Sequence, residues 1–241
     1  MPSHPSERQR PAGQTIMTLV LALDCAVSGL GVAVVRDGVC LASLREEGRD
    51  QAARLLPAVA SVLRDAGVGR HELSLIAVTI GPGSFTGVRV GLAAARGLAV
   101  GLDVPLAGLS TTAVLMTQAA PRDRLVVAAV DSRLGDWFCA IGAGAAAPVA
   151  TTAAELADRL QGRACVVVGA DVGPLVAQLT AAGVDAEAET AFVDPVAVAR
   201  LGLAQDVDVW RARNESEGLP RPLYLRGVSI TLPDGARRIV D

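Results

Sequence analysis

A glycine-rich stretch at residues 80–101, reading IGPGSFTGVRVGLAAARGLAVG, constrains the fold of this chain more than any other segment. The Gly-Pro-Gly at residues 81–83 predicts a tight turn, because glycine adopts backbone angles that other residues avoid. Apolar residues then recur at the spacing of one helix face, at Val88, Leu92, Ala95 and Ala99. The stretch therefore predicts a turn that leads directly into a helix, with Ser84 or Thr86 as the helix cap.

Small residues four positions apart line one face of this predicted helix, namely Gly87, Gly91 and Ala95. A glycine inside a helix costs about 1 kcal/mol relative to alanine, so a bland surface helix would not be expected to keep them. Something must therefore pack closely against this face. We interpret the face as a docking surface for another helix or backbone segment.

The glycine turn does not match the common phosphate-binding or nucleophile loops. Thr86 stands where G-x-G-x-x-G needs its last glycine, and Pro82 and Thr86 stand where G-x-S-x-G around Ser84 needs glycines. All 22 basic residues are arginine, which excludes a Walker A loop, a Schiff-base enzyme and a protein kinase, since each needs a specific lysine. The two histidines, His4 and His71, supply neither a zinc-ligand pair nor a convincing base for serine hydrolysis.

The charge pattern, the cysteines and the apolar runs exclude further classes of protein. The net charge is −3 with both signs interleaved, so the chain lacks the basic stripe that direct nucleic-acid binding needs. The four cysteines show no C-x-x-C spacing and lie in apolar runs, which favours buried, reduced thiols in a cytoplasmic protein over a disulfide or zinc site. No run is long enough to span a bilayer once its Gly, Asp and Arg interruptions are counted, so we expect no membrane partner.

The order of the predicted elements repeats along the chain. A first series of strands and helices is expected at residues 18–23, 30–35, 39–44, 51–66, 73–80 and 86–101, followed by a short strand at 105–108 and a helix at 110–119. A second series is expected at residues 125–130, 136–142, 152–160, 164–168, 172–182 and 195–210. Because the second series opens as the first does, we interpret the chain as a duplicated β-β-β-α-β-α unit.

Four regions follow from this pattern. Residues 1–16 are polar and contain proline, so we expect a disordered leader, and Met17 stays open as the true start. Residues 17–109 form the predicted N-terminal lobe and residues 110–215 the predicted C-terminal lobe. Residues 216–241 are expected to be an irregular tail because of their prolines and arginines.

An aspartate follows or ends the first strand of each predicted lobe, Asp24 in one and Asp131 in the other. That plan is similar to the actin, sugar-kinase and Hsp70 group, in which two ribonuclease H-like lobes clasp a nucleotide. The fold class expected from this similarity is α/β, with two actin-like lobes that each hold a mixed sheet flanked by helices. For Asp24 we favour a place in a nucleotide cleft, whereas Asp131 equally well caps a turn.

Arg89 and Arg96 lie seven residues apart, hence on nearly the same face of the glycine helix. They could bind a phosphate or the carboxylates of a partner, or they could form a solvated ridge with no partner. We favour contact with a partner, because the adjacent small face already predicts a second helix.

Four motifs, in the same order and spacing, resemble the TsaB family, formerly named YeaZ. They are GPGSFTGVRVGL at residues 81–92, GLST at 108–111, DSRLGD at 131–136 and PLYLR at 222–226. The similarity runs from residue 17 to residue 226. It implies a two-lobed actin-like fold and a non-catalytic scaffold or activator subunit in tRNA N6-threonylcarbamoyladenosine modification, with no metal and no cofactor of its own.

The resemblance also implies partners. The related TsaD subunit carries the metal and transfers the threonylcarbamoyl group, the ATPase TsaE joins the pair, and tRNA is bound only through the complex. ATP or ADP would then lie in the partner subunits, and the isolated chain would form a homodimer. The family's pairing surface corresponds to the predicted helices at residues 51–66 and 86–101. The residues expected in it are Gln51, Leu55, Val59, Gly81, Gly83, Ser84, Phe85, Thr86, Gly87, Arg89, Val90, Gly91, Ala94 and Arg96.

Two positions depart from the family pattern. Asp24, Cys25 and Ala26 replace the usual D-T-S or D-T-A, which weakens the case for a nucleotide in this chain's own cleft, and Gln51 replaces a frequent histidine at the pairing surface. The alternative function that stays open is an actin-fold ATPase or phosphotransferase in which Asp24 holds a metal-bound water. A remnant peptidase ranks third.

Overall fold

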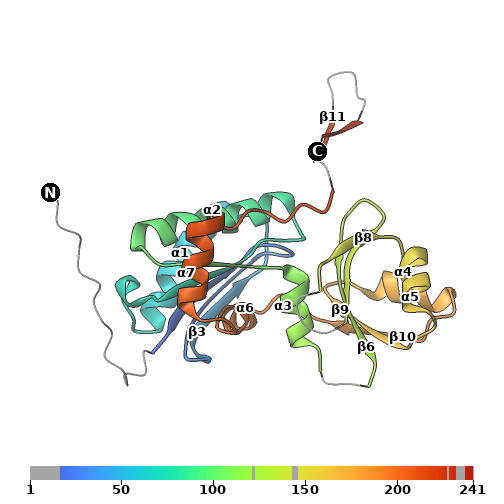
Figure 1. Cartoon of the computed structure of the whole chain (residues 1–241), viewed down its shortest axis with the longest axis horizontal. Coiled ribbons are helices and arrows are strands. Elements are labelled where there is room, and N and C mark those ends of the chain that lie inside the picture. Colours follow the sequence, from blue (N-terminus) through green and yellow to red (C-terminus); the bar gives the residue numbers. More distant parts are fainter. Residues whose placement is uncertain (1–16, 121–122, 143–145, 227, 232–236, 241) are drawn as a thin grey trace.

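Two lobes lie side by side in the computed structural model of the chain, which describes residues 17–120, 123–142, 146–226, 228–231 and 237–240 (Figure 1). Each lobe is built on a five-stranded mixed sheet with helices packed on it. This arrangement is the α/β fold of two actin-like lobes that the sequence predicts. The leader expected at residues 1–16 lies outside the described residues.

The first sheet has the strand order β3-β2-β1-β4-β5. Its strands are β1 (Leu19–Asp24), β2 (Leu30–Arg36), β3 (Val39–Glu46), β4 (Leu75–Thr79) and β5 (Leu106–Leu109). The first three pair antiparallel, as predicted, whereas β4 pairs parallel with β1 and β5 with β4. Every residue of β1 and β4 is buried, because helices cover both faces of these central strands.

The second sheet repeats this topology with the order β10-β9-β6-β7-β8. Its strands are β6 (Leu125–Asp131), β7 (Trp137–Ile141), β8 (Val149–Thr151), β9 (Cys165–Gly169) and β10 (Ala186–Thr190). β6 and β7 correspond to β1 and β2, and β9 takes the parallel place of β4, so the predicted duplication is confirmed. Two strands are not predicted from the sequence, because β8 has three residues and β10 reads AEAET, which is poor in strand-forming side chains.

Two pairs of helices cover the outer faces of the sheets. α1 (Gln51–Asp65) and α2 (Phe85–Leu102) pack on the first sheet, and α4 (Ala153–Leu160) and α5 (Gly173–Ala181) pack on the second. The short 3-10 helix η1 (Arg70–Glu72) leads into β4. The helices predicted at residues 51–66, 86–101, 152–160 and 172–182 are thus confirmed.

The helices α3 (Thr111–Gln118) and α6 (Pro195–Gly202) lie between the two sheets (Figure 1). α3 packs against β6, β7 and β9, α6 packs against β1 and β2, and the two helices contact each other. One continuous apolar cluster therefore joins the inner faces of both sheets. α6 falls within the predicted second lobe by sequence but covers the sheet of the first, and the lobe limits at residues 109 and 215 stay a prediction.

The last predicted helix, at residues 195–210, is two helices. α7 (Val207–Glu217) follows α6 after a break, where the side chain of Asp206 accepts a hydrogen bond from the backbone N–H of Asp208 at 2.8 Å. Aspartate is a favoured cap, so a local signal for this break is present in the sequence. The indole N–H of Trp210 donates to the carbonyl of Gly202 at 2.8 Å, which holds α7 against α6.

The tail, predicted to be irregular from residue 216, is only partly so. α7 continues to Glu217, and β11 (Val228–Thr231) pairs antiparallel with β12 (Arg237–Val240). The prediction is wrong for these segments because it rests on proline and arginine content, whereas each strand carries β-branched residues and finds its partner close by in the chain.

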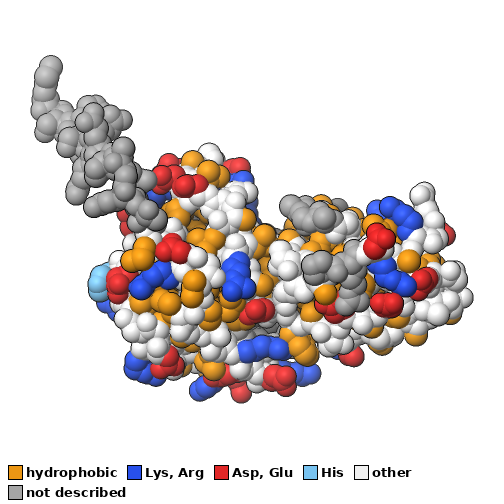
Figure 2. All heavy atoms as spheres, turned by 90° about the horizontal axis from the view of Figure 1, so that it is seen from below, with side chains coloured by type: hydrophobic (Ala, Val, Ile, Leu, Met, Phe, Trp, Pro, Cys, Tyr) orange, Lys and Arg blue, Asp and Glu red, His pale blue; other side chains and the backbone are white. Residues whose placement is uncertain are grey.

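The expectations about charge distribution, cysteine burial and membrane-spanning segments have different outcomes. Figure 2 shows acidic and basic side chains interspersed over the face seen from below, in agreement with the charge pattern of the sequence. Cys25, Cys139 and Cys165 are buried free thiols, as expected, but Cys40 is exposed on β3. α2 is 18 residues long with a mean hydropathy of 1.3, so its length and composition alone would allow it to cross a membrane. This corrects the expectation that no segment of the chain is long enough to span a bilayer. A helix that packs on the core of a globular lobe has the same properties.

We predict that Asn214→Ala lowers the free energy of unfolding by about 1–2 kcal/mol. The side-chain amide of Asn214 completes the edge strand β5, because its Oδ1 accepts from the N–H of Leu106 at 2.7 Å and its Nδ2 donates to the carbonyl of Leu106 at 3.0 Å. Urea unfolding measures the change. The exposed neighbour Glu215 provides the control, since Glu215→Ala is expected to change stability by roughly 0.5 kcal/mol or less; equal losses in the two variants would contradict the prediction.

Candidate functional site

The glycine turn begins where β4 ends and places Ser84 at the start of α2. The hydroxyl of Ser84 accepts a hydrogen bond from the backbone N–H of Gly87 at 3.2 Å, so Ser84 rather than Thr86 is the cap. Gly81 and Gly83 have φ angles of 105° and 159°, in the region that other residues rarely adopt. The predicted tight turn into a helix is therefore confirmed.

The loop after β1 packs directly against this turn. The N–H of Ser84 donates to the carbonyl of Ala26 at 2.6 Å. A Cβ atom on Gly83 would lie 2.1 Å from that carbonyl oxygen, and a Cβ atom on Gly87 would lie 2.0 Å from the carbonyl oxygen of Cys25. Neither separation is possible for real atoms, so both positions require glycine for the backbone segments to meet.

The small face of α2 is thus filled by the chain itself. Gly87, Gly91 and Ala95 are buried, and a Cβ atom on Gly91 would lie 3.5 Å from the Cβ of Cys25. The prediction that something packs closely on this face is confirmed. The interpretation of the face as a docking surface is corrected, because its neighbour is the loop after β1 and the sheet beneath.

The residues expected at the pairing surface on α1 are mostly turned inward. Leu55 and Val59 are 1% and 4% exposed and belong to the core of the first lobe. Gln51 is half-buried, and its side-chain amide donates to the carbonyls of Gly29 and Gly48 at 3.4 Å each. These three residues therefore serve the packing of the first lobe and leave little side chain for a partner.

Most of the expected residues at the start of α2 remain accessible. Exposed or half-buried there are Gly83, Ser84, Phe85, Thr86, Arg89, Val90 and Ala94. Gly81 is buried together with the glycines of the helix face. Any surface for a partner on this helix must therefore be formed by its outer side.

Arg96 holds the tail of this chain. Its Nε donates to the carbonyl of Pro220 and its Nη2 to the carbonyl of Leu219, each at 3.0 Å. From the sequence, Arg96 is expected either to contact a partner or to lie on a solvated ridge. The structure shows neither, because its guanidinium already donates to carbonyl groups of the same chain. Nothing local in the sequence indicates this contact, since Arg96 and Pro220 are 124 residues apart.

Arg89 lies in an exposed aromatic cluster. Its guanidinium carbon lies 3.2 Å from the ring centroid of Phe85 and 5.2 Å from that of Tyr224 in the tail. The Phe85 and Tyr224 ring centroids are 6.4 Å apart. Both rings are about half exposed although aromatic residues are scarce in this chain.

Asp24 ends β1 inside the protein and is only 4% exposed. Its Oδ1 accepts hydrogen bonds from the hydroxyl of Thr79 at 2.6 Å and from the N–H of Ala26 at 3.1 Å. Burial raises the pKa of this carboxyl, and the two hydrogen bonds oppose that rise. The side chain thus links β1 to β4 and to the loop after β1. A role in a nucleotide cleft would require an accessible carboxylate, whereas this one is enclosed.

Cys25 follows Asp24 and is equally enclosed. Burial raises the pKa of its thiol to about 12, with a smaller contribution from the neighbouring Asp24 carboxyl. A thiol with this pKa stays protonated near neutral pH and is a weak nucleophile. Among the described residues, no group of three or more His, Cys, Asp or Glu side chains could hold a metal ion.

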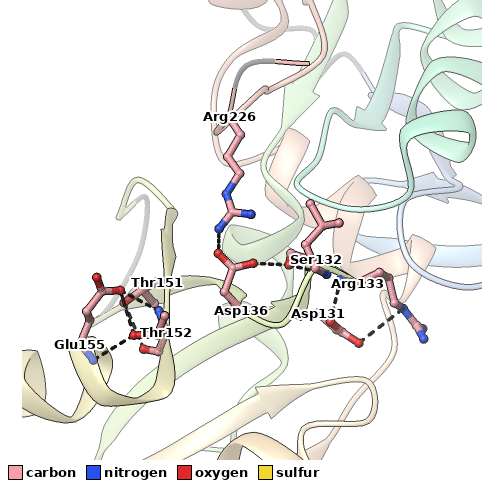
Figure 3. A network of polar contacts seen from close by, with 9 residues as sticks. Asp131, Ser132, Arg133, Asp136, Thr151, Thr152, Glu155 and Arg226 are labelled. Atoms are coloured by element: carbon pink, nitrogen blue, oxygen red, sulfur yellow. Dashed lines mark hydrogen bonds and ion pairs between the residues drawn. The ribbon is translucent and has the colours of Figure 1, made fainter. Parts of the chain in front are cut away.

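Asp131, which corresponds to Asp24 in the second sheet, caps a turn. Its Oδ1 accepts a hydrogen bond from the N–H of Arg133 at 2.7 Å, and its Oδ2 lies 3.4 Å from the Nε of the same arginine (Figure 3). Of the two interpretations that the sequence left open, the turn cap is therefore the one observed.

Asp136, five residues further on, is a buried charged residue that the sequence interpretation missed. Its carboxylate accepts a hydrogen bond from the hydroxyl of Ser132 and forms an ion pair with Arg226 of the tail (Figure 3). The two partners lie in the motifs DSRLGD and PLYLR, but nothing local in either motif indicates that they meet. Only the tertiary structure brings them together.

The chain is similar to proteins of tRNA modification. Residues 45–191 match the family model described as "TsaD: tRNA N6-adenosine threonylcarbamoyltransferase". The "tRNA threonylcarbamoyladenosine biosynthesis protein TsaB" of Escherichia coli (strain K12) is 38% identical over 124 residues, which cover 50% of this chain and 53% of that protein. The protein of the same description from Bacillus subtilis (strain 168) is 34% identical over 120 residues, which cover 49% of this chain and 52% of that protein. The chain thus spans about half the length of the curated relatives it matches.

A solved structure covers more of the chain. "YeaZ from Pseudomonas aeruginosa" superimposes with a TM-score of 0.66 at 27% sequence identity and covers 86% of this chain and 100% of that chain. The similarity therefore extends over both lobes.

We predict that Gly87→Ala lowers the free energy of unfolding by about 1–3 kcal/mol, because the new methyl group would meet the backbone carbonyl of Cys25. Gly97 is the matched control. It lies on the same helix, is exposed and has no atom within 4 Å of an added Cβ, so Gly97→Ala is expected to raise stability by up to about 1 kcal/mol. Urea unfolding of both variants measures the two changes, and a loss in Gly97→Ala as large as that in Gly87→Ala would contradict the packing argument.

We predict that Asp24→Asn changes how stability depends on pH. The folded-state pKa of Asp24 is raised, so above the ordinary value of about 3.9 the folded chain holds a proton that the unfolded chain has lost. Stability from this group therefore falls as pH rises from that value to the raised pKa. Asparagine keeps the acceptor oxygen and cannot ionise, so the stability of the variant relative to the unaltered chain should increase from pH 4 to pH 7 in urea unfolding. A difference that stays constant over this range would contradict the prediction.

Proposed function

Because the chain belongs to the family described by the TsaD model, and within it to the TsaB (YeaZ) proteins, we propose that it is a non-catalytic subunit for tRNA N6-threonylcarbamoyladenosine synthesis. The match of residues 45–191 to the family model carries the proposal. The TsaB names of its curated relatives support a role in the same modification. In this role the chain binds and activates the transferase subunit TsaD, to which it is itself related.

We place the contact with TsaD on the outer side of α1 and α2. Three exposed large apolar side chains support this surface, and they are Leu56, Phe85 and Val100. Between them the exposed surface of α2 carries Ala93 and Gly97, whose small size lets another backbone approach. Exposed apolar groups of this kind favour burial against a second protein. The inward glycine face is not part of the proposed contact.

The packing around Asp24 supports a subunit without a chemical step of its own. The alternative of an ATPase or phosphotransferase requires the carboxylate to hold a metal-bound water, whereas Asp24 is enclosed and accepts two hydrogen bonds from its own chain. Cys25 is a buried, protonated thiol. We therefore assign the transfer chemistry, with its metal and ATP or ADP, to the partner subunits.

The remaining partners follow from the same proposal. The net charge of −3 supports tRNA binding through the complex rather than by this chain directly. The ATPase TsaE is expected to join the pair in the cytoplasm. Without TsaD, two copies of this chain are expected to cover the same apolar side of α1 and α2 with each other.

We predict that Ala60→Arg on α1 and Gly97→Arg on α2 each weaken binding to TsaD about tenfold or more, since both positions are exposed and a large charged side chain would have to be buried on association. Thr180→Arg, at an exposed position of α5 in the second lobe, is the control and should bind normally. Titration calorimetry with purified TsaD measures the affinities, and circular dichroism checks folding.

The same variants test the function in a reconstituted reaction with TsaD, TsaE, ATP, a donor of the threonylcarbamoyl group, and tRNA. Modified tRNA should form with the unaltered chain and with Thr180→Arg, and should be reduced with Ala60→Arg and Gly97→Arg. Full modification in the absence of the chain would overturn the proposed function. Full binding by both α1 and α2 variants would overturn only the proposed contact surface.

A further inference from the structure

The segment from residue 219 to residue 226, here called the strap, is fixed to the first lobe at several points. Arg96 of α2 donates to two of its carbonyls, as described above, and the N–H of Leu223 donates to the carbonyl of Ile80 at 2.8 Å. Pro220 packs so closely on Gly108 that an added Cβ atom there would lie 2.5 Å from the Pro220 ring. These contacts set the path of the strap along the first lobe although it has no regular secondary structure.

The far end of the strap is fixed to the second lobe instead. Arg226 forms its ion pair with Asp136, which lies between β6 and β7 of the second sheet (Figure 3). The side chain of Asp136 is 8% exposed and that of Arg226 is 39% exposed. Since a buried carboxylate without a cation is costly, the pair strongly favours an arrangement in which the strap reaches the second lobe.

The strap and the apolar cluster between the sheets join the lobes at different places. The helices α3 and α6 connect the inner faces of the sheets, whereas the strap passes the glycine turn and reaches the second lobe at the turn between β6 and β7 (Figure 1). A rotation of one lobe about α3 and α6 would therefore pull Arg226 away from Asp136. The ion pair between the strap and the second lobe opposes such a rotation.

We propose that the strap is a lock that holds the two lobes in one relative orientation, with the Arg226–Asp136 ion pair as its closing contact. Arg96 and the backbone of Ile80 hold the strap to the first lobe, and the ion pair holds it to the second. This device depends only on the chain itself and does not rest on the proposed binding of TsaD.

Pulsed electron paramagnetic resonance tests the lock in the full chain. One nitroxide label is attached to the exposed Cys40 on β3, and the other to a cysteine introduced by Thr180→Cys on α5. The other three cysteines are buried and stay unlabelled. The distance distribution between the labels reports the relative position of the lobes.

Arg226→Gln and Asp136→Asn are each expected to raise the fraction of molecules outside the distance peak of the unaltered chain about tenfold. The double variant should change the distribution no further than the larger single effect, since both substitutions break one contact. Arg221→Gln removes the same charge from an exposed position of the strap and should leave the peak unchanged.

The proposal is overturned if the distribution of Arg226→Gln coincides with that of the unaltered chain. It is also overturned if Arg221→Gln broadens the distribution as much as Arg226→Gln does, because the effect would then come from charge rather than from the lock. Arg226 is the more exposed partner of the pair, so its variant decides the question even if Asp136→Asn fails to fold.

Discussion

The close contact between the glycine turn and the loop after β1 is the constraint on which the first lobe depends. Gly83 and Gly87 bring the start of α2 against the backbone of Ala26 and Cys25 at distances that no side chain would permit. Asp24 then closes the same unit from the sheet side through Thr79 and Ala26. Backbone packing therefore explains why glycine stands at positions 83 and 87.

This packing also separates the two sides of α2. Its inner side is used for the fold, and its outer side carries small and apolar residues that remain accessible. The division is what the proposed function needs, since a subunit that acts through contact requires a rigid helix whose outer surface is not needed for its own stability. The enclosed Asp24 and the protonated Cys25 fit the same division, because neither is placed to act on a substrate.

The two lobes are copies in topology but are not independent in packing. α3 leaves the first sheet to cover the second, and α6 returns from the second to cover the first, so both sheets share one apolar cluster. The strap adds a second connection near the glycine turn, in which Arg96 binds it to the first lobe and Arg226 binds it to the second. A chain with small side chains and few aromatic rings thus obtains a defined arrangement of its lobes from crossed helices and charged contacts.

The sequence by itself determined most of the local elements and indicated the class of the protein, but it did not predict β8, β10, β11, β12 or the break between α6 and α7. Residue spacing predicts the turn, the small face of α2 and the repeated unit. The lack of lysine excludes several classes of enzyme, and the four motifs point to one family. Tertiary structure decided what fills the small face, which residues of α1 are buried, and where Arg96 and Asp136 find their partners. The physical reason is that the spacing of residues along a helix determines which of its faces carries small or charged side chains. Which segment packs on that face depends on contacts between residues as far apart in the sequence as Arg96 and Pro220, which are separated by 124 residues.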